Sequence, residues 1–240
     1  MKTKTLLALF LMLLSFSVYS QEGGRYLLSK ALALPENEYY KVEHLVITGS
    51  FENLYVLPPQ IFKFKNLRML EITNQSIRRI DADISKLTKL GLISIDLCEK
   101  LEELPKEIAN LPSLGTLHIS GSYNLKDFSF LAGSDLRVLS LIQCGLFDLP
   151  KEVQSMPNLT SLNLDGNVIT NISANLCKLN KLETLNLSSN REAYLPDCIA
   201  NLPLKTLSLW GVNMSKKDFK ALKEKLPNTK IMQHQYGDKK

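Results

Sequence analysis

Histidine and the usual catalytic motifs are scarce in this sequence. It has three histidines among 240 residues, His44, His118 and His234. The motifs of zinc proteases, serine hydrolases, phosphate-binding loops and CxxC redox sites are all absent. A catalytic or metal site needs several reactive groups that converge on one point. The sequence therefore favours a protein that is not an enzyme, and it predicts no cofactor and no metal site.

The sequence also has few cysteines and only a small net charge. Four cysteines exclude a scaffold built on disulfides, so the core must come from apolar packing. The net charge is +5, and without Lys2 and Lys4 it is +3, with 27 basic against 24 acidic residues. A charge this small gives no reason to expect nucleic acid as a partner.

Long hydrophobic runs are missing except near the N-terminus. Lys2 and Lys4 precede an apolar stretch over residues 6–18, and Val18 and Ser20 place small residues where signal peptidases cut. This pattern predicts a signal peptide over residues 1–20. The stretch is shorter than the roughly 20 residues that span a bilayer, although an uncleaved anchor is an alternative. We expect a mature chain without a transmembrane segment, exported to the periplasm, the cell surface or the medium.

Leucine, by contrast, is abundant and regularly spaced. Residues 159–167 read LTSLNLDGN and residues 182–190 read LETLNLSSN. Looser copies of this Leu-x-x-Leu-x-Leu-x-x-Asn phrase begin at residues 42, 67, 90, 114, 136 and 204, which makes eight copies at steps of 22 to 25 residues. A second phrase, Leu-Pro-x-x-Ile-x-x-Leu, follows most copies, as in residues 104–111, 149–156 and 195–202. A fixed period of this length is the signature of a repeat protein.

These two phrases together resemble the leucine-rich repeat family in its 22–24-residue form. The resemblance covers residue 42 to about residue 212 and implies an α/β fold, a right-handed solenoid with a parallel sheet on its concave side. About eight strands and short convex helices are expected. The period-2 alternation supports the strands, and the spacing of Leu195, Ile199 and Leu202 fits about two helical turns.

The ends of such a solenoid need caps that cover the leucines of the terminal repeats. The segment 26–32 predicts a short amphipathic helix, and Ser215 with Asp218 predicts the start of a C-terminal one. Ile231 suggests a final edge strand. The expected organisation is a signal peptide (1–20), an N-terminal cap (21–41), repeats (42–213), and a C-terminal cap helix and tail (214–240).

In the family that the sequence resembles, the last position of the first phrase is an asparagine. The resemblance implies that this side chain satisfies backbone groups of the neighbouring turn and so forms a ladder along the solenoid. Here the position is held by Ser50, Gln75, Cys98, Ser122, Cys144, Asn167, Asn190 and Val212. We expect the ladder to be better ordered in the C-terminal half, where both asparagines lie. The fourth repeat lacks Leu-Pro-x-x-Ile, and we expect Phe128 and Leu131 to fill its core.

The four cysteines fall into two pairs. Cys98 and Cys144 hold the same turn position two repeats apart, about 10 Å, which exceeds the reach of a disulfide. Both are expected to be buried and reduced. Cys177 and Cys198 lie on adjacent convex segments, where a disulfide or two free thiols are both compatible with the sequence.

The outward positions of the predicted strands form the candidate binding surface. They are mostly small and polar, with a few carboxylates and a tryptophan that either contacts a ligand or packs on the C-terminal cap. The candidate ligand-binding residues are Glu71, Asp96, His118, Ser140, Ile142, Asn163, Asp165, Asn186 and Trp210. We expect a protein or peptide ligand on the concave sheet. The alternatives are glycan recognition, or an inhibitory or structural partner of another exported protein.

Overall fold

The computed structural model of the chain describes residues 24–49 and 54–233. The predicted signal peptide, Ser50 of the turn positions, His234 and most of the C-terminal tail lie outside the described residues. In the part that is described, no helix is both long enough and apolar enough to cross a membrane.

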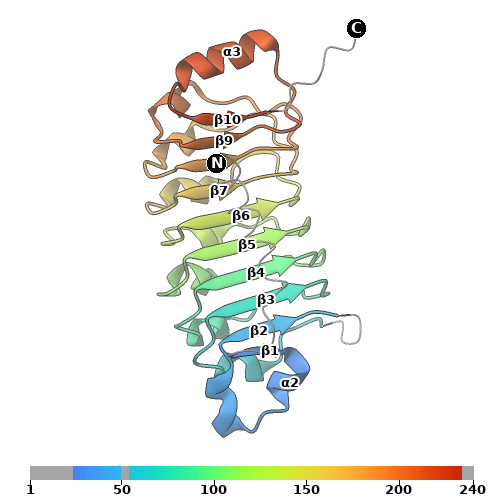
Figure 1. The fold of residues 1–240 in the computed structure, drawn as a ribbon. Coiled ribbons are helices and arrows are strands. Elements are labelled where there is room, and N and C mark those ends of the chain that lie inside the picture. Colours follow the sequence, from blue (N-terminus) through green and yellow to red (C-terminus); the bar gives the residue numbers. More distant parts are fainter. Residues whose placement is uncertain (1–23, 50–53, 234–240) are drawn as a thin grey trace, which may run out of the picture.

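The centre of the fold is one parallel sheet whose strands follow each other in chain order (Figure 1). The eight middle strands coincide with the eight predicted repeats, so the parallel solenoid expected from the sequence is confirmed. The strands are β1 (Arg25–Leu27), β2 (His44–Ile47), β3 (Met69–Thr73), β4 (Leu92–Asp96), β5 (Thr116–Ser120), β6 (Val138–Ile142), β7 (Ser161–Asn163), β8 (Thr184–Asn186), β9 (Thr206–Ser208) and β10 (Lys230–Met232).

The sheet has ten strands because each cap contributes one. The N-terminal cap was expected to be helical from Tyr26, yet residues 25–27 form β1 and the helix α2 covers only Leu28–Leu32. The backbone explains the difference: β2 has an open edge, and β1 pairs with it through Tyr26 and Leu45. At the other end, helix α3 (Lys216–Lys225) begins at Ser215, whose Oγ accepts from the Asp218 N–H, as the sequence predicts. The strand expected at Ile231 is β10.

The convex side consists of short 3-10 helices instead of two-turn α-helices. Most have five residues, and their bonds run from residue i+3 to residue i, as from the Ile108 N–H to the Pro105 carbonyl at 3.1 Å. A repeat of this length leaves too few residues behind the strand for two α-helical turns. The helices are η2 (Glu36–Lys41), η3 (Pro59–Lys63), η4 (Ala82–Lys86), η5 (Lys106–Asn110), η6 (Ser129–Leu131), η7 (Lys151–Ser155), η8 (Ala174–Lys178) and η9 (Asp197–Asn201).

The core lies between the sheet and the convex helices and is built from the leucines and isoleucines of the two phrases. Leu70, Leu117 and Leu185, at equivalent strand positions, are fully buried. In the irregular fourth repeat Phe128 and Leu131 are buried as expected, and Phe130 joins them. That repeat therefore keeps a filled core, with η6 reduced to three residues.

The two asparagines form the best-ordered part of the turn ladder. Asn167 Oδ1 accepts from the backbone N–H groups of Cys144 and Leu146, at 2.9 and 3.1 Å. Its Nδ2 donates to the carbonyls of Leu141 and Leu164, at 2.7 and 2.8 Å. One repeat further along, Asn190 accepts from the Ile169 N–H at 3.0 Å and donates to the carbonyls of Leu164 and Leu187. The expectation of better order in the C-terminal half holds for these two turns, but Gln75 makes a similar set of bonds in the N-terminal half: its Oε1 accepts from the Leu54 N–H at 3.0 Å and its Nε2 donates to the Thr73 and Asn74 carbonyls.

Two of the four cysteines are free and the other two form a disulfide. Cys98 and Cys144 are free and buried, and burial raises the pKa of the Cys144 thiol to about 11. Burial likewise raises the pKa of Cys98. Cys177 and Cys198 form a disulfide that joins η8 to η9 across a Cα–Cα distance of 6.0 Å. The structure thus takes the bridged arrangement of the two that the sequence leaves open.

Candidate binding site on the sheet

The solvent-facing side of the sheet, called the concave face, presents its side chains in register. The middle position runs across neighbouring strands from Ser94 through His118, Ser140 and Asn163 to Asn186. The next outward position runs from Asp96 through Ser120 to Ile142, and Asp165 follows just beyond β7. The residues that the sequence singled out therefore share one face: those on adjacent strands are neighbours, whereas Glu71 on β3 and Trp210 after β9 lie six strands apart.

The N-terminal part of the concave face is closed by ion pairs. Glu71 lies 3.1 Å from His44 Nε2 and 3.9 Å from an Arg25 guanidinium nitrogen. The short contact with His44 lacks the alignment of a hydrogen bond, because His44 Nε2 has no hydrogen-bond partner. The Glu71 carboxylate therefore lies against two side chains of its own chain, Arg25 and His44. Sequence reasoning missed Arg25, because no strand was expected in the N-terminal cap.

The middle of the face holds a short hydrogen-bonded chain. His118 Nε2 and Asp96 Oδ1 are 2.9 Å apart, and the Ser94 hydroxyl donates to Asp96 Oδ2 at 2.8 Å. Burial raises the pKa of Asp96, but the hydrogen bond and charge of His118, with the Ser94 bond, outweigh burial and hold that pKa below its usual value. Asp96 is thus an ionised carboxylate held in place. The i, i+2 spacing of Ser94 and Asp96 on one strand was the signal that could have joined Ser94 to the site.

This constellation is not built like a hydrolase triad. A nucleophilic serine must give its proton to the histidine, whereas the Ser94 hydroxyl donates to the carboxylate. The described residues also contain no group of three or more histidine, cysteine or acidic side chains that could hold a metal ion. The geometry fits recognition better than bond cleavage.

The next strands leave polar groups without partners on the same face. Ser140 Oγ and Asp165 Oδ1 are shielded from water and have no hydrogen-bond partner. Asn163 and Asn186 use their side-chain oxygens to accept from the N–H groups of Asp165 and Ser188. Their amide NH₂ groups therefore remain as donors. We call Ser140, Asn163, Asp165 and Asn186 the open polar segment.

Apolar groups border the open polar segment on the concave face. Ile142 is half-buried at the end of β6, and the N–H of the next residue, Gln143, donates to the Asp165 carbonyl at 2.9 Å. Trp210 follows β9 and is 40% exposed, so a large part of its ring system faces solvent. An apolar border around a few polar groups is the composition typical of a recognition surface.

Comparisons with known proteins agree with this architecture. Residues 134–191 match the family model described as leucine rich repeat. The chain is 31% identical over 164 residues to the disease resistance protein RML1A of Arabidopsis thaliana, covering 68% of this chain and 16% of that protein. It is also 31% identical over 77 residues to RPS4B of the same plant, covering 32% of this chain and 7% of that protein. The chain thus spans only a small part of these curated relatives.

Solved structures show the same fold. The leucine-rich repeat domain of the type III effector XopL matches with a TM-score of 0.55 at 23% identity, over 75% of this chain and 72% of that one. Internalin C2 from Listeria monocytogenes matches with a TM-score of 0.56 at 22% identity, over 75% and 78%. The plant peptide hormone receptor RGFR1, in complex with RGF2, matches at 0.53 and 19%, over 91% and 38%.

The repeats, the sheet and the family match point the same way. Proteins built on this repeat generally act as non-catalytic scaffolds for protein interactions. With eight repeat copies in phase and residues 134–191 matching the family model, the chain belongs to the leucine-rich repeat family.

Proposed function

We propose that this protein binds a protein or peptide on its concave face, with the open polar segment at the centre of the contact. The observation that carries the proposal is that Ser140 Oγ and Asp165 Oδ1 are buried without a partner beside two free amide donors. A buried polar group without a hydrogen bond costs about 1–3 kcal/mol. A ligand that forms these bonds, once the Ser140 and Asp165 side chains rotate toward it, removes that cost, and peptide backbones carry both donors and acceptors.

The contrast with the rest of the face supports this location. Glu71 and Asp96 are already paired with histidines, whereas Asp165 keeps one carboxylate oxygen free. The structure of the plant peptide hormone receptor RGFR1 in complex with RGF2 is a precedent for a peptide ligand on a protein of this fold. The same segment could hydrogen-bond a glycan, so the experiment includes that outcome.

The test compares two double variants in crosslinking capture from native envelope and medium fractions. Ser140→Ala with Asp165→Asn removes the free hydroxyl and the free charge, and should weaken capture about 10- to 100-fold through lost hydrogen bonds to charged and neutral groups. Glu107→Gln with Glu152→Gln changes two carboxylates on the convex helices η5 and η7 and should capture as the wild type does. Equal capture by both variants contradicts the proposal. Loss of capture after glycosidase treatment, but not protease treatment, assigns the ligand to glycans.

We also propose that the protein acts outside the cytoplasm. The charged and apolar pattern of residues 1–20 supports export. The disulfide between Cys177 and Cys198 supports it independently, because disulfides persist in oxidising compartments. Protein isolated from its native cells should begin at Gln21 and be found outside the cytoplasm. A cytoplasmic chain that begins at Met1 contradicts this.

A further inference from the structure

A second polar feature lies on the edge of the sheet where the strands begin. Each residue immediately before a strand bonds through its backbone to the equivalent residue of the next repeat, as from the Arg137 N–H to the Gly115 carbonyl at 2.9 Å. We call these residues the strand-start column. Its members are Glu43, Arg68, Gly91, Gly115, Arg137, Thr160, Glu183 and Lys205.

Charges at both ends of the strand-start column are neutralised by the neighbouring repeat. Arg68 Nε lies 3.5 Å from a Glu43 carboxylate oxygen. Lys205 Nζ lies 2.7 Å from a Glu183 carboxylate oxygen. In both cases the cation has the glutamate of the preceding repeat beside it. At both ends of the column, each cation is therefore paired with one glutamate.

Arg137, in the centre of the column, lacks that glutamate. The preceding repeat offers Gly115, and the repeat before it offers Gly91, so neither supplies a side chain. The following repeat offers Thr160, whose hydroxyl donates to the Arg137 carbonyl at 3.0 Å. Among the described residues, the Arg137 guanidinium has neither an ion pair nor a hydrogen bond.

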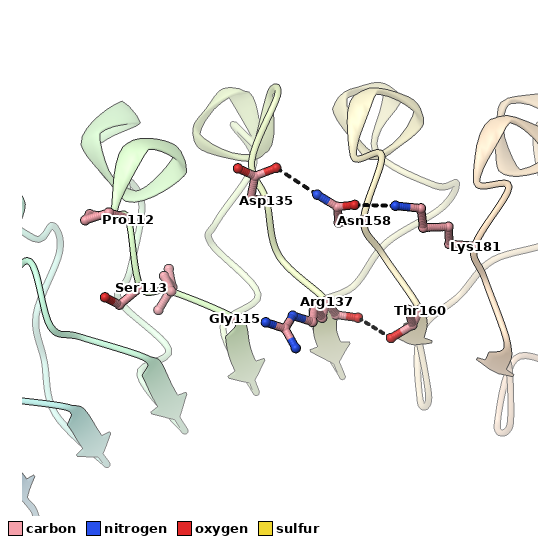
Figure 2. A pocket seen from close by; sticks show the side chains of 9 residues that line it. Pro112, Ser113, Gly115, Asp135, Arg137, Asn158, Thr160 and Lys181 are labelled. Carbon is pink, nitrogen blue, oxygen red and sulfur yellow. Dashed lines mark hydrogen bonds between the residues drawn. The ribbon is translucent and has the colours of Figure 1, made fainter.

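A cleft of about 370 Å³ opens at this gap in the column. Figure 2 shows the Arg137 side chain directed toward Gly115 within it. Across the cleft, Asn158 donates to Asp135 at 3.0 Å and accepts from Lys181 Nζ at 2.6 Å. The charges of Asp135 and Lys181, which are linked through Asn158, cancel each other. The net positive charge of the cleft therefore comes from Arg137.

We propose that this cleft binds an acidic side chain of a protein partner, with its carboxylate on Arg137. The partner supplies the glutamate that Glu43 and Glu183 supply at the ends of the column. A planar guanidinium matches a carboxylate in geometry as well as in charge. The net charge of one in the cleft fits a monoanion, whereas a dianionic phosphate meets the Asp135 carboxylate in the same space. The site lies at the start of β6 and β7, three residues before Ser140 and Asn163, and the proposal does not depend on the open polar segment.

Gly115 offers a way to test the cleft without removing Arg137. A Cβ atom built on Gly115 has no neighbour within 4 Å, and its backbone is not in the left-handed region. Gly115→Glu should therefore fold and place a carboxylate beside Arg137, closing the site from within. Gly115→Ala is the matched control, because it adds a Cβ and no charge.

The experiment follows the side-chain Nε–H signals of the arginines by NMR while small probes are added to the whole chain. The acetylated and amidated tripeptide Gly-Glu-Gly, with one carboxylate, should shift the Arg137 signal with half-saturation in the millimolar range typical of one charge-assisted contact. Gly115→Ala should respond as the wild type does. Gly115→Glu should start from a shifted signal and lose the response.

Several outcomes would overturn the proposal. An equal response to the neutral Gly-Gln-Gly peptide, or an equal response of the exposed Arg79 and Arg191, means that no specific site exists. A larger response to inorganic phosphate or to glucuronate assigns the cleft to another ligand. A stronger response to the free carboxyl terminus of acetyl-Gly-Gly-Gly replaces the acidic side chain with a chain end.

Discussion

The turns of repeats six and seven differ from those of repeats three to five in how they satisfy the backbone. Asn167 accepts from two N–H groups of the preceding repeat and donates to the Leu141 carbonyl of that repeat and to the Leu164 carbonyl of its own. Cys144, at the same position, only donates, with Sγ 3.3 Å from the Ile142 carbonyl and 3.7 Å from the Ile119 carbonyl. The Ser122 hydroxyl has no partner at all. Asn167 thus acts as both acceptor and donor toward the preceding repeat, as Gln75 of the second repeat also does, whereas the side chains of Cys144 and Ser122 do not.

The largest effect that follows from this difference concerns Asn167. Asn167→Ala should lower the free energy of unfolding by about 3–4 kcal/mol, because it leaves several buried backbone groups without partners at about 1–3 kcal/mol each. Urea unfolding measures the change. A loss below about 1 kcal/mol would contradict the account of the ladder.

The disulfide should give the next largest effect. Replacing Cys177 and Cys198 by serine opens a link across a sequence separation of 21 residues and should lower the free energy of unfolding by about 3 kcal/mol. Alkylation of the unfolded chain, followed by mass measurement, checks the bridge itself. Two modified thiols without reductant and four with reductant are expected, whereas four in both cases would remove the bridge.

Ser122→Ala provides the opposite half of the ladder comparison. The hydroxyl it removes is fully buried and makes no hydrogen bond. The variant should therefore be neutral or more stable by up to about 1 kcal/mol in the same urea experiment. A loss as large as that of Asn167→Ala would show that the two turns are equivalent after all.

The smallest effect concerns the paired carboxylate Asp96. Its pKa lies below the usual value in the folded state, so its contribution to stability is present above the unfolded pKa and is lost as pH falls through the folded pKa. Carbon NMR of the Asp96 carboxyl group should show this low pKa. His118→Ala should raise it, because the hydrogen bond and the charge of His118 are removed. An unchanged titration in the variant would mean that His118 does not hold the carboxylate.

Much of the fold could be predicted because the repeat fixes it many times over. Period-2 leucines at a constant step set the eight middle strands and their register, including the row from Ser94 to Asn186. The caps occur only once, so their pattern has no copies to confirm it. Residues 26–27 were expected to begin a helix, but residues 25–27 pair with the open edge of β2 as a strand.

The site could be predicted as a row of residues but not as a set of contacts. The sequence places Glu71, Asp96 and Asp165 on one face, yet it does not show that a histidine lies against each of the first two. Side-chain pairing depends on rotamers and on distances of a few tenths of an ångström, which spacing does not encode. The cleft at Arg137 was also missed, although comparing the residues before each strand would have shown two glycines where charged residues stand at both ends.

The most direct test of the central claim compares crosslinking from the two sides of the solenoid. A photoreactive benzoylphenylalanine replaces either Thr184, on β8 of the concave face, or Lys151, exposed on the convex helix η7. The account predicts one distinct crosslinked partner from position 184, lost when Ser140→Ala and Asp165→Asn are added, and none from position 151. A partner crosslinked from position 151 alone, or equally from both, would contradict binding on the concave face.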